Sequence, residues 1–164
     1  MGARCSESRA CGIYVTGARE FRERGDGMPT AVVTWKGGEA FEAVMPSGNR
    51  VVLDGESKQG PGPMEILLGA LGACTAVDVV AILAKKRQRL VSLEILVSGE
   101  RAPEPPKVWT TIEMVYRFTG EVEEKAARDA IQLSKNKYCS VSAMLEKTAK
   151  ITYRVEIGEK GSPK

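Results

Sequence analysis

The sequence has 164 residues, of which 43% are hydrophobic and 5% aromatic, and its 24 basic and 21 acidic residues give a net charge of +3. This length predicts one domain with its own core, and the mild charge, with no basic stretch interleaved with aromatics, excludes the usual pattern of a nucleic-acid-binding protein. Because the chain contains no histidine, every mechanism that needs a histidine base and every histidine metal ligand is excluded.

The first 27 residues are rich in Arg, Glu and Gly and show no hydrophobic period. They lack the continuous apolar core of a signal peptide, and acidic residues such as Glu7 and Asp26 argue against a transit peptide. We therefore expect residues 1–27 to be a poorly ordered leader in which Cys5 and Cys11 are incidental thiols. The default compartment is a reducing cytoplasm, where cysteines are usually free or catalytic.

Three short segments rich in β-branched residues follow, separated by turn signals at residues 36–38 and 46–49. Such segments predict a three-stranded antiparallel sheet, formed by residues 30–35, 40–45 and 50–53. The polar stretch 54–62 then reads as a loop that leads into the longest apolar segment of the chain.

Residues 61–89 predict one long helix that is apolar nearly all the way round, with Cys74 in its middle. Proline precedes it, Glu65 falls in its first turn, and a basic cluster closes it, as the helix dipole favours. Asp78 is the only charge between Ile66 and Ala84. Such a helix is buried on most faces, and the rest of this chain is short for that purpose, so we expect a second subunit to cover part of it.

A run of about 18 or more apolar residues is also the pattern of a membrane span. Asp78, near the centre, would be costly in lipid, and Gly69 and Gly72 suit close packing inside a protein. We therefore interpret the segment as a core helix and predict no membrane partner.

The second half of the chain alternates strands and helices. Residues 92–101 and 108–119 alternate apolar and polar side chains and predict strands, separated by a proline-rich break at 102–107. Two helices are predicted at 122–134 and 138–150, interrupted at residues 135–137, before a last strand at 151–157. The order βββ-α-ββ-αα-β predicts an α+β domain over residues 28–158 with antiparallel sheets, followed by a flexible tail at 159–164.

Two interior cysteines, Cys74 and Cys139, are the candidates for chemistry. No two of the four cysteines form a C-x-x-C pair, so we predict neither a metal site nor a cofactor. Cys139 is predicted at a helix start just after Lys135 and Lys137, a setting that lowers a thiol pKa. The alternative is that both cysteines are small buried hydrophobic residues.

Two motifs around these cysteines resemble those of the OsmC/Ohr superfamily. Residues 62–74, GPMEILLGALGAC, are similar to its first cysteine motif, and residues 137–141, KYCSV, are similar to its second. Residues 77–83, VDVVAIL, look like the YhfA-like branch in particular. The resemblance covers about residues 30–157.

The resemblance implies an intertwined homodimer whose central helices are buried between subunits. It also implies a thiol peroxidase of oxidative stress defence that acts on small organic hydroperoxides. In such enzymes the first cysteine, here Cys74, attacks the peroxide and becomes a sulfenic acid. The second, here Cys139, resolves it as a disulfide that an external dithiol reduces.

The active peroxidases of this superfamily assist the first cysteine with an arginine from the N-terminal sheet and a glutamate directly after the motif proline. Here Met64 follows Pro63, Glu65 comes one position later, and Arg50 is the only arginine between residue 30 and the helix. Glu65 and Arg50 are therefore the candidate supporting residues. Two other hypotheses remain: a redox-sensing or thiol-reactive binding protein without fast turnover, and a structural dimer whose cysteines are merely packed.

Overall fold

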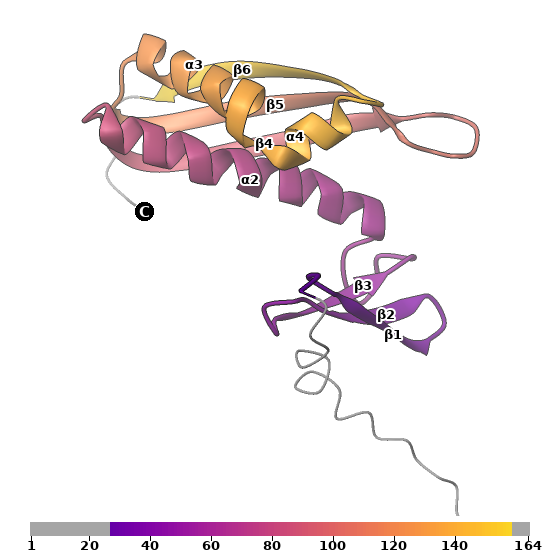
Figure 1. The fold of residues 1–164 in the computed structure, drawn as a ribbon. Helices are drawn as coiled ribbons and strands as arrows, with labels where there is room; N and C mark the ends of the chain where they lie inside the picture. Colours follow the sequence, from indigo (N-terminus) through magenta and orange to yellow (C-terminus); the bar gives the residue numbers. More distant parts are fainter. Residues whose placement is uncertain (1–26, 159–164) are drawn as a thin grey trace, which may run out of the picture. The chain divides into compact units, whose positions relative to one another are not determined.

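The computed structural model describes residues 27–158. The predicted leader, apart from Gly27, and the predicted tail lie outside this range. The chain divides into two compact units between Gly62 and Pro63, and this division falls inside the domain predicted for residues 28–158. Figure 1 shows the two units, each of which contains one three-stranded sheet.

The first unit is the predicted antiparallel meander. Its strands pair in the order β1-β2-β3, with bounds β1 Val32–Gly37, β2 Ala40–Val44 and β3 Arg50–Asp54. Gly37 and Gly38 turn the chain between β1 and β2 with φ values of 108° and 55°, which glycine adopts without steric cost. The first strand begins and ends two residues later than we predicted.

After β3, the side chain of Asp54 organises the loop that precedes the helix. Its two carboxylate oxygens accept backbone N–H groups of Glu56, Lys58 and Gln59 at 2.9, 3.2 and 2.9 Å. These bonds lower the pKa of Asp54, with the Glu56 N–H as the largest cause.

The second unit contains the long helix, a second sheet and the shorter helices. Its elements are α2 Pro63–Lys85, β4 Arg89–Arg101, β5 Trp109–Glu121, α3 Glu124–Leu133, the π-helix η2 Ser134–Tyr138, α4 Ser140–Leu145 and β6 Lys150–Gly158. The predicted helix 61–89 is confirmed as an element but ends four residues early, because β4 already begins at Arg89.

The second sheet has the order β4-β5-β6, and the predicted antiparallel pairing holds for β4 and β5. In contrast, β6 pairs with β5 in parallel. The reason is the connection: α3, η2 and α4 form a crossover that returns the chain to the starting end of β5, and parallel neighbours require such a crossover.

The helices cover one face of this sheet, and the core of the second unit lies between them (Figure 1). The sheet contributes alternate residues of β5, and the helices contribute apolar stripes. Fully buried members of this core are Leu71, Val79, Leu83, Ile112, Tyr116, Phe118, Ala127, Ala130 and Ile131. Four of the five buried positions of α2 repeat every four residues, from Leu71 to Leu83, as expected for one face of a helix.

The opposite side of α2 carries apolar residues that this chain leaves uncovered. Val77 is 71% exposed and Val80 is 44% exposed. Beside them, a groove of about 360 Å³ runs between α2 and β4, lined by Leu68, Gly69, Gly72, Ala73, Ala76, Leu93, Ile95 and Val97. The expected burial on most faces is therefore not supplied by one copy of the chain.

The helix α2 is also the one helix among residues 27–158 that is long and apolar enough to cross a membrane. Its buried stripe packs against a sheet, as the core helix of a folded domain does.

Two predictions for the crossover were wrong. Residues 135–137 do not interrupt the helical segment, because η2 continues α3 with the wider i→i+5 pattern up to Tyr138. The helix predicted for residues 138–150 is shorter, since α4 spans only Ser140–Leu145 before the chain turns into β6.

Candidate functional site

Cys74 lies in the middle of α2 and is half-buried. It packs against the edge of the core rather than within the fully buried stripe. The next residue, Thr75, belongs to that stripe and is 2% exposed. This position fixes the backbone of Cys74 in a rigid helix while its thiol stays partly accessible.

Cys139 lies at the junction of η2 and α4 and is 2% exposed. Its backbone N–H donates to the carbonyl of Ser134 at 2.8 Å, which closes η2. Its Sγ accepts the backbone N–H of Ser142 at 3.3 Å and so serves as the N-cap of α4. Both the backbone and the side chain of Cys139 are therefore held by local hydrogen bonds.

The structure places these two predicted site residues near one another, because Cys74 packs against the core cluster to which Cys139 belongs and is a cause of the raised pKa of Cys139. Both cysteines are free thiols in this state. Burial, with the neighbouring Cys74 as the next cause, raises the pKa of Cys139 to about 11. At neutral pH the proton therefore stays on Cys139.

The predicted lowering of the Cys139 pKa by nearby lysines was wrong. Lys135 Nζ pairs with Glu146 at 3.1 Å and donates to the carbonyl of Ile151, and Lys137 Nζ lies 5.6 Å from the ring centroid of Tyr138. The backbone N–H of Ser142 does lower the pKa, as a helix start should, but desolvation outweighs it.

A buried tyrosine borders the two cysteines. The phenol of Tyr116, which is 1% exposed, donates to Thr75 Oγ1 at 3.0 Å and lies 3.7 Å from Met114 Sδ. Burial raises the pKa of Tyr116 to about 12, and the neighbouring Cys139 acts in the same direction. On the side of the sheet, the site is therefore bordered by apolar side chains and by the neutral phenol of Tyr116.

Arg50 and Glu65, the predicted supporting residues, occupy two different units. Arg50 lies in β3, where its guanidinium pairs with Glu42 at 2.9 Å. Glu65 is exposed in the first turn of α2, nine positions before Cys74. Nine residues rotate a helix by about 180° beyond two full turns, so Glu65 points away from the Cys74 side of α2. Their roles remain predictions.

No group of three His, Cys, Asp or Glu side chains gathers within residues 27–158 in a way that could hold a metal ion. The donors around the cysteine pair are backbone N–H groups and hydroxyls, which suit thiol chemistry rather than metal binding.

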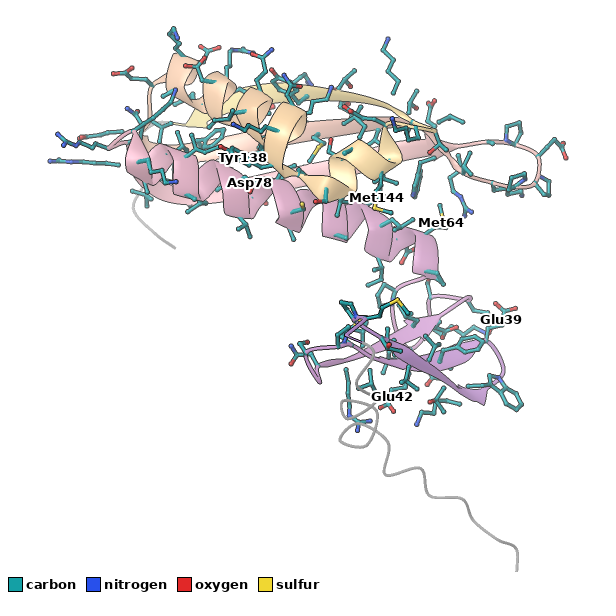
Figure 2. All side chains as sticks on the ribbon, in the orientation of Figure 1. Glu39, Glu42, Met64, Asp78, Tyr138 and Met144 are labelled. Carbon is teal, nitrogen blue, oxygen red and sulfur yellow. The ribbon has the colours of Figure 1, made fainter. Side chains whose placement is uncertain are left out.

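The sequence interpretation missed Tyr116, Thr75 and Ser134 as parts of this site. For Ser134 a signal existed in its partner: Asp78, the only charge between Ile66 and Ala84, needs a polar partner in a helix that packs on a core. The Ser134 hydroxyl is that partner and donates to Asp78 Oδ2 at 2.8 Å. Figure 2 shows Asp78 on the side of α2 that faces the crossover.

Comparisons with known proteins agree on one family. The family described as OsmC-like protein matches residues 55–154. Protein YhfA of Escherichia coli K12 is 41% identical over 129 residues, which cover 77% of this chain and 96% of that protein. A crystal structure of a hypothetical protein from Aquifex aeolicus has a TM-score of 0.75 at 33% identity and covers 82% of this chain and 98% of that one.

An organic hydroperoxide resistance protein from Elizabethkingia anophelis is also similar, with a TM-score of 0.61. It is 13% identical, and the match covers 81% of this chain and 99% of that one. At this identity the similarity concerns the fold alone.

Proposed function

Because this chain belongs to the OsmC-like protein family, we propose that it reduces organic hydroperoxides through a cycle of its two cysteines. The observation that carries the proposal is the proximity of the two cysteines: Cys74 packs against the core cluster that contains Cys139 and helps to raise the pKa of its thiol. A sulfenic acid on one sulfur then has a resolving thiol within reach, which is the arrangement of a reversible thiol peroxidase. The substrate class follows the name of the Elizabethkingia protein.

The burial of the two thiols divides the roles in this cycle. Cys139 is 2% exposed and protonated at neutral pH, whereas Cys74 is half-buried. A peroxide therefore reaches Cys74, and we assign it the first attack. Cys139 is the resolving thiol. Arg50 and Glu65 stay the supporting candidates.

The proposed cycle has three steps. The Cys74 thiol gives up its proton, its sulfur attacks the terminal peroxide oxygen, and the O–O bond breaks. The sulfur is oxidised to a sulfenic acid, and the leaving alkoxide takes up the proton and departs as an alcohol. Cys139 Sγ then attacks Cys74 Sγ, a disulfide forms, and the hydroxyl leaves as water with the Cys139 proton. An external dithiol reduces the disulfide and is itself oxidised to a disulfide.

A second copy of the chain is the proposed partner in assembly, and the cytoplasm is the proposed compartment. The support for a dimer is the uncovered apolar side of α2 with Val77 and Val80, together with the adjoining groove. Folded proteins rarely expose a continuous apolar face of this kind without a partner.

The test treats Cys74→Ser and Cys139→Ser separately with cumene hydroperoxide and determines the products by intact mass. Cys139→Ser is expected to accumulate sulfenic or sulfinic acid on Cys74, while Cys74→Ser stays largely unoxidised at the same dose. The reverse pattern would exchange the two roles. No oxidation of either variant would refute the peroxidase and favour a structural dimer.

A redox sensor or thiol-reactive binding protein is the second candidate, and the raised pKa of Cys139 favours it. A thiol that is neutral at pH 7 closes a disulfide slowly, which would prolong the sulfenic state of Cys74. Stopped-flow measurement with cumene hydroperoxide and a dithiol separates the two candidates. A peroxidase turns over many times, whereas a sensor gives one stoichiometric oxidation followed by slow recovery.

A further inference from the structure

A polar contact links the helix that carries Cys74 to the turn that carries Cys139. The hydroxyl of Ser134, which is fully buried, donates to Asp78 Oδ2 at 2.8 Å. Asp78 follows Cys74 by four positions, so the two side chains leave α2 only about 40° apart. The contact therefore lies one helical turn from the reactive thiol, on the same side of α2.

The other end of this contact leads directly to Cys139. Ser134 is the first residue of η2, and its carbonyl accepts the Cys139 N–H at 2.8 Å in the i→i+5 bond that closes the π-turn. Asp78 therefore positions Ser134, whose carbonyl in turn accepts the backbone N–H of Cys139. Single π-turns are uncommon and recur at functional sites.

A second set of contacts, made by Lys135, holds η2 against α4 and the sheet but not against α2. Lys135 ties η2 to the end of α4 through Glu146 at 3.1 Å and to the start of β6 through the carbonyl of Ile151 at 3.3 Å. These bonds fix η2 relative to the sheet and α4. The Asp78–Ser134 bond ties η2 to α2, the helix that carries Cys74.

We propose that Asp78 and Ser134 are a positioning pair that holds Cys139 in register with Cys74 and thereby sets how readily the two sulfurs form a disulfide. In the peroxidase cycle, which rests on the proposed function, the pair decides the fate of the Cys74 sulfenic acid. In register, attack by Cys139 forms the S–S bond and releases water. Out of register, a second hydroperoxide oxidises the same sulfur to a sulfinic acid and leaves as an alcohol.

The primary test measures the disulfide without any peroxide. The full-length protein is equilibrated with mixtures of reduced and oxidised glutathione, and the fraction of Cys74–Cys139 disulfide is determined by intact mass after thiol alkylation. Loss of one well-placed hydrogen bond corresponds to roughly a tenfold change in an equilibrium. Ser134→Ala and Asp78→Leu are therefore each expected to lower the equilibrium constant for the disulfide roughly tenfold. Asp78→Asn, whose amide oxygen still accepts the Ser134 hydroxyl, is expected to stay near the wild-type value.

Ser92→Ala is the matched control, because it also removes a side-chain hydroxyl that is hydrogen-bonded in the second unit, to Thr119 at 2.6 Å. It should leave the disulfide equilibrium unchanged. If Ser134→Ala fails to fold by circular dichroism, Asp78→Leu carries the test alone. A wild-type disulfide equilibrium in a folded Ser134→Ala or Asp78→Leu protein overturns the proposal, as does an equal loss in Asp78→Asn.

A second readout connects the pair to the proposed function. After a fixed dose of cumene hydroperoxide, Ser134→Ala should give a several-fold higher ratio of sulfinic acid to disulfide than wild type, while the rate of Cys74 oxidation is unchanged. If hydroperoxide oxidises neither protein, the proposed function fails. The glutathione measurement still decides on the positioning pair in that case, so the two failures are distinguishable.

Discussion

The phenol of Tyr116 and the hydroxyl of Thr75 are joined by a 3.0 Å hydrogen bond that connects the central strand of the second sheet to α2 beside Cys74. The Thr75 hydroxyl in turn donates a hydrogen bond to the carbonyl of Gly72 at 3.1 Å. Tyr116 is only 1% exposed, so water cannot replace Thr75 as the hydrogen-bond partner of the phenol. A second hydrogen bond joins the same two elements, from Trp109 Nε1 on β5 to the carbonyl of Met64 on α2 at 3.2 Å.

The first prediction concerns stability at high pH. Burial raises the pKa of Cys139 from 9.0 to about 11 and that of Tyr116 from 10.0 to about 12. The unfolded chain therefore loses these protons at lower pH than the folded chain, so both groups stabilise the fold below pH 9 and this contribution is lost as pH rises towards 12. Urea denaturation between pH 8 and pH 11.5 should show a steady fall in the free energy of unfolding.

Tyr116→Phe provides the control for this pH dependence. At pH 7 it should lower the free energy of unfolding by about 1 kcal/mol, because the hydrogen bond to Thr75 is lost. Above pH 10 its stability curve should fall less steeply than that of wild type. Parallel curves for the two proteins would show that Tyr116 does not titrate as burial requires.

A second prediction concerns Gly120, near the end of β5. Its φ is +118°, and a Cβ at this position would overlap the carbonyl oxygen of Arg89 on β4. Gly120→Ala should therefore cost about 2 kcal/mol or more in unfolding free energy. Gly158→Ala is the matched control, since its Cβ would meet its neighbours at 3.5 Å, an ordinary contact. Equal melting temperatures for the two variants would contradict the strain at Gly120.

The third prediction tests whether a second copy covers α2. Val77→Glu places a charge on the uncovered apolar side of the helix, where Val77 is 71% exposed. In a dimer that buries this side, the unpaired charge should raise the dissociation constant by at least about a hundredfold, since burying a charge without a partner costs several kcal/mol. Analytical ultracentrifugation at micromolar concentration measures the change.

Gln132→Glu is the control for that experiment, because it adds the same charge at an exposed position of α3. It should leave the mass unchanged. If the wild-type protein sediments as a stable folded monomer, the prediction of a dimer is wrong.

The fourth prediction concerns the loop that Asp54 organises in the first unit. Asp54→Ala removes the acceptor of three backbone N–H groups, so the amides of Glu56, Lys58 and Gln59 should exchange with deuterium at least tenfold faster. The same protection should fade in wild type at acid pH. The pKa of Asp54 is lowered in the fold, so its stabilisation is present above pH 3.8 and is lost as pH falls below it. Unchanged exchange rates in Asp54→Ala would show that the loop does not depend on the Asp54 carboxylate for its order.

The elements that the sequence predicts well are those whose signals are local. The start of α2 follows from Pro63 and the first-turn Glu65, and the strands on either side of residues 102–107 follow from alternation and a proline-rich break. The two cysteines were identified from two sequence motifs, and in the structure Cys74 is a neighbour of Cys139. These signals need no information from distant parts of the chain.

The features that the sequence did not predict depend on partners far away in it. Residues 135–137 look like a break, yet η2 forms there, and its first two residues are held by Asp78 and by the carbonyl of Ile151. The pKa of Cys139 follows from burial by the whole second unit, which outweighs its place at a helix start. The parallel pairing of β6 is likewise a property of the crossover rather than of the strand itself.

That crossover has a consequence for how the newly made chain folds. The β4–β5 hairpin joins neighbouring segments and can form early, whereas β6 can pair with β5 only after residues 122–149 have been arranged, a long loop that is slow to close. Cys139 lies inside this late segment, so it reaches Cys74 only when the second unit is nearly native. We expect pulsed hydrogen exchange during refolding to protect β5 against β4 before β6, and the cysteines to remain unpaired throughout synthesis even in an oxidising solution.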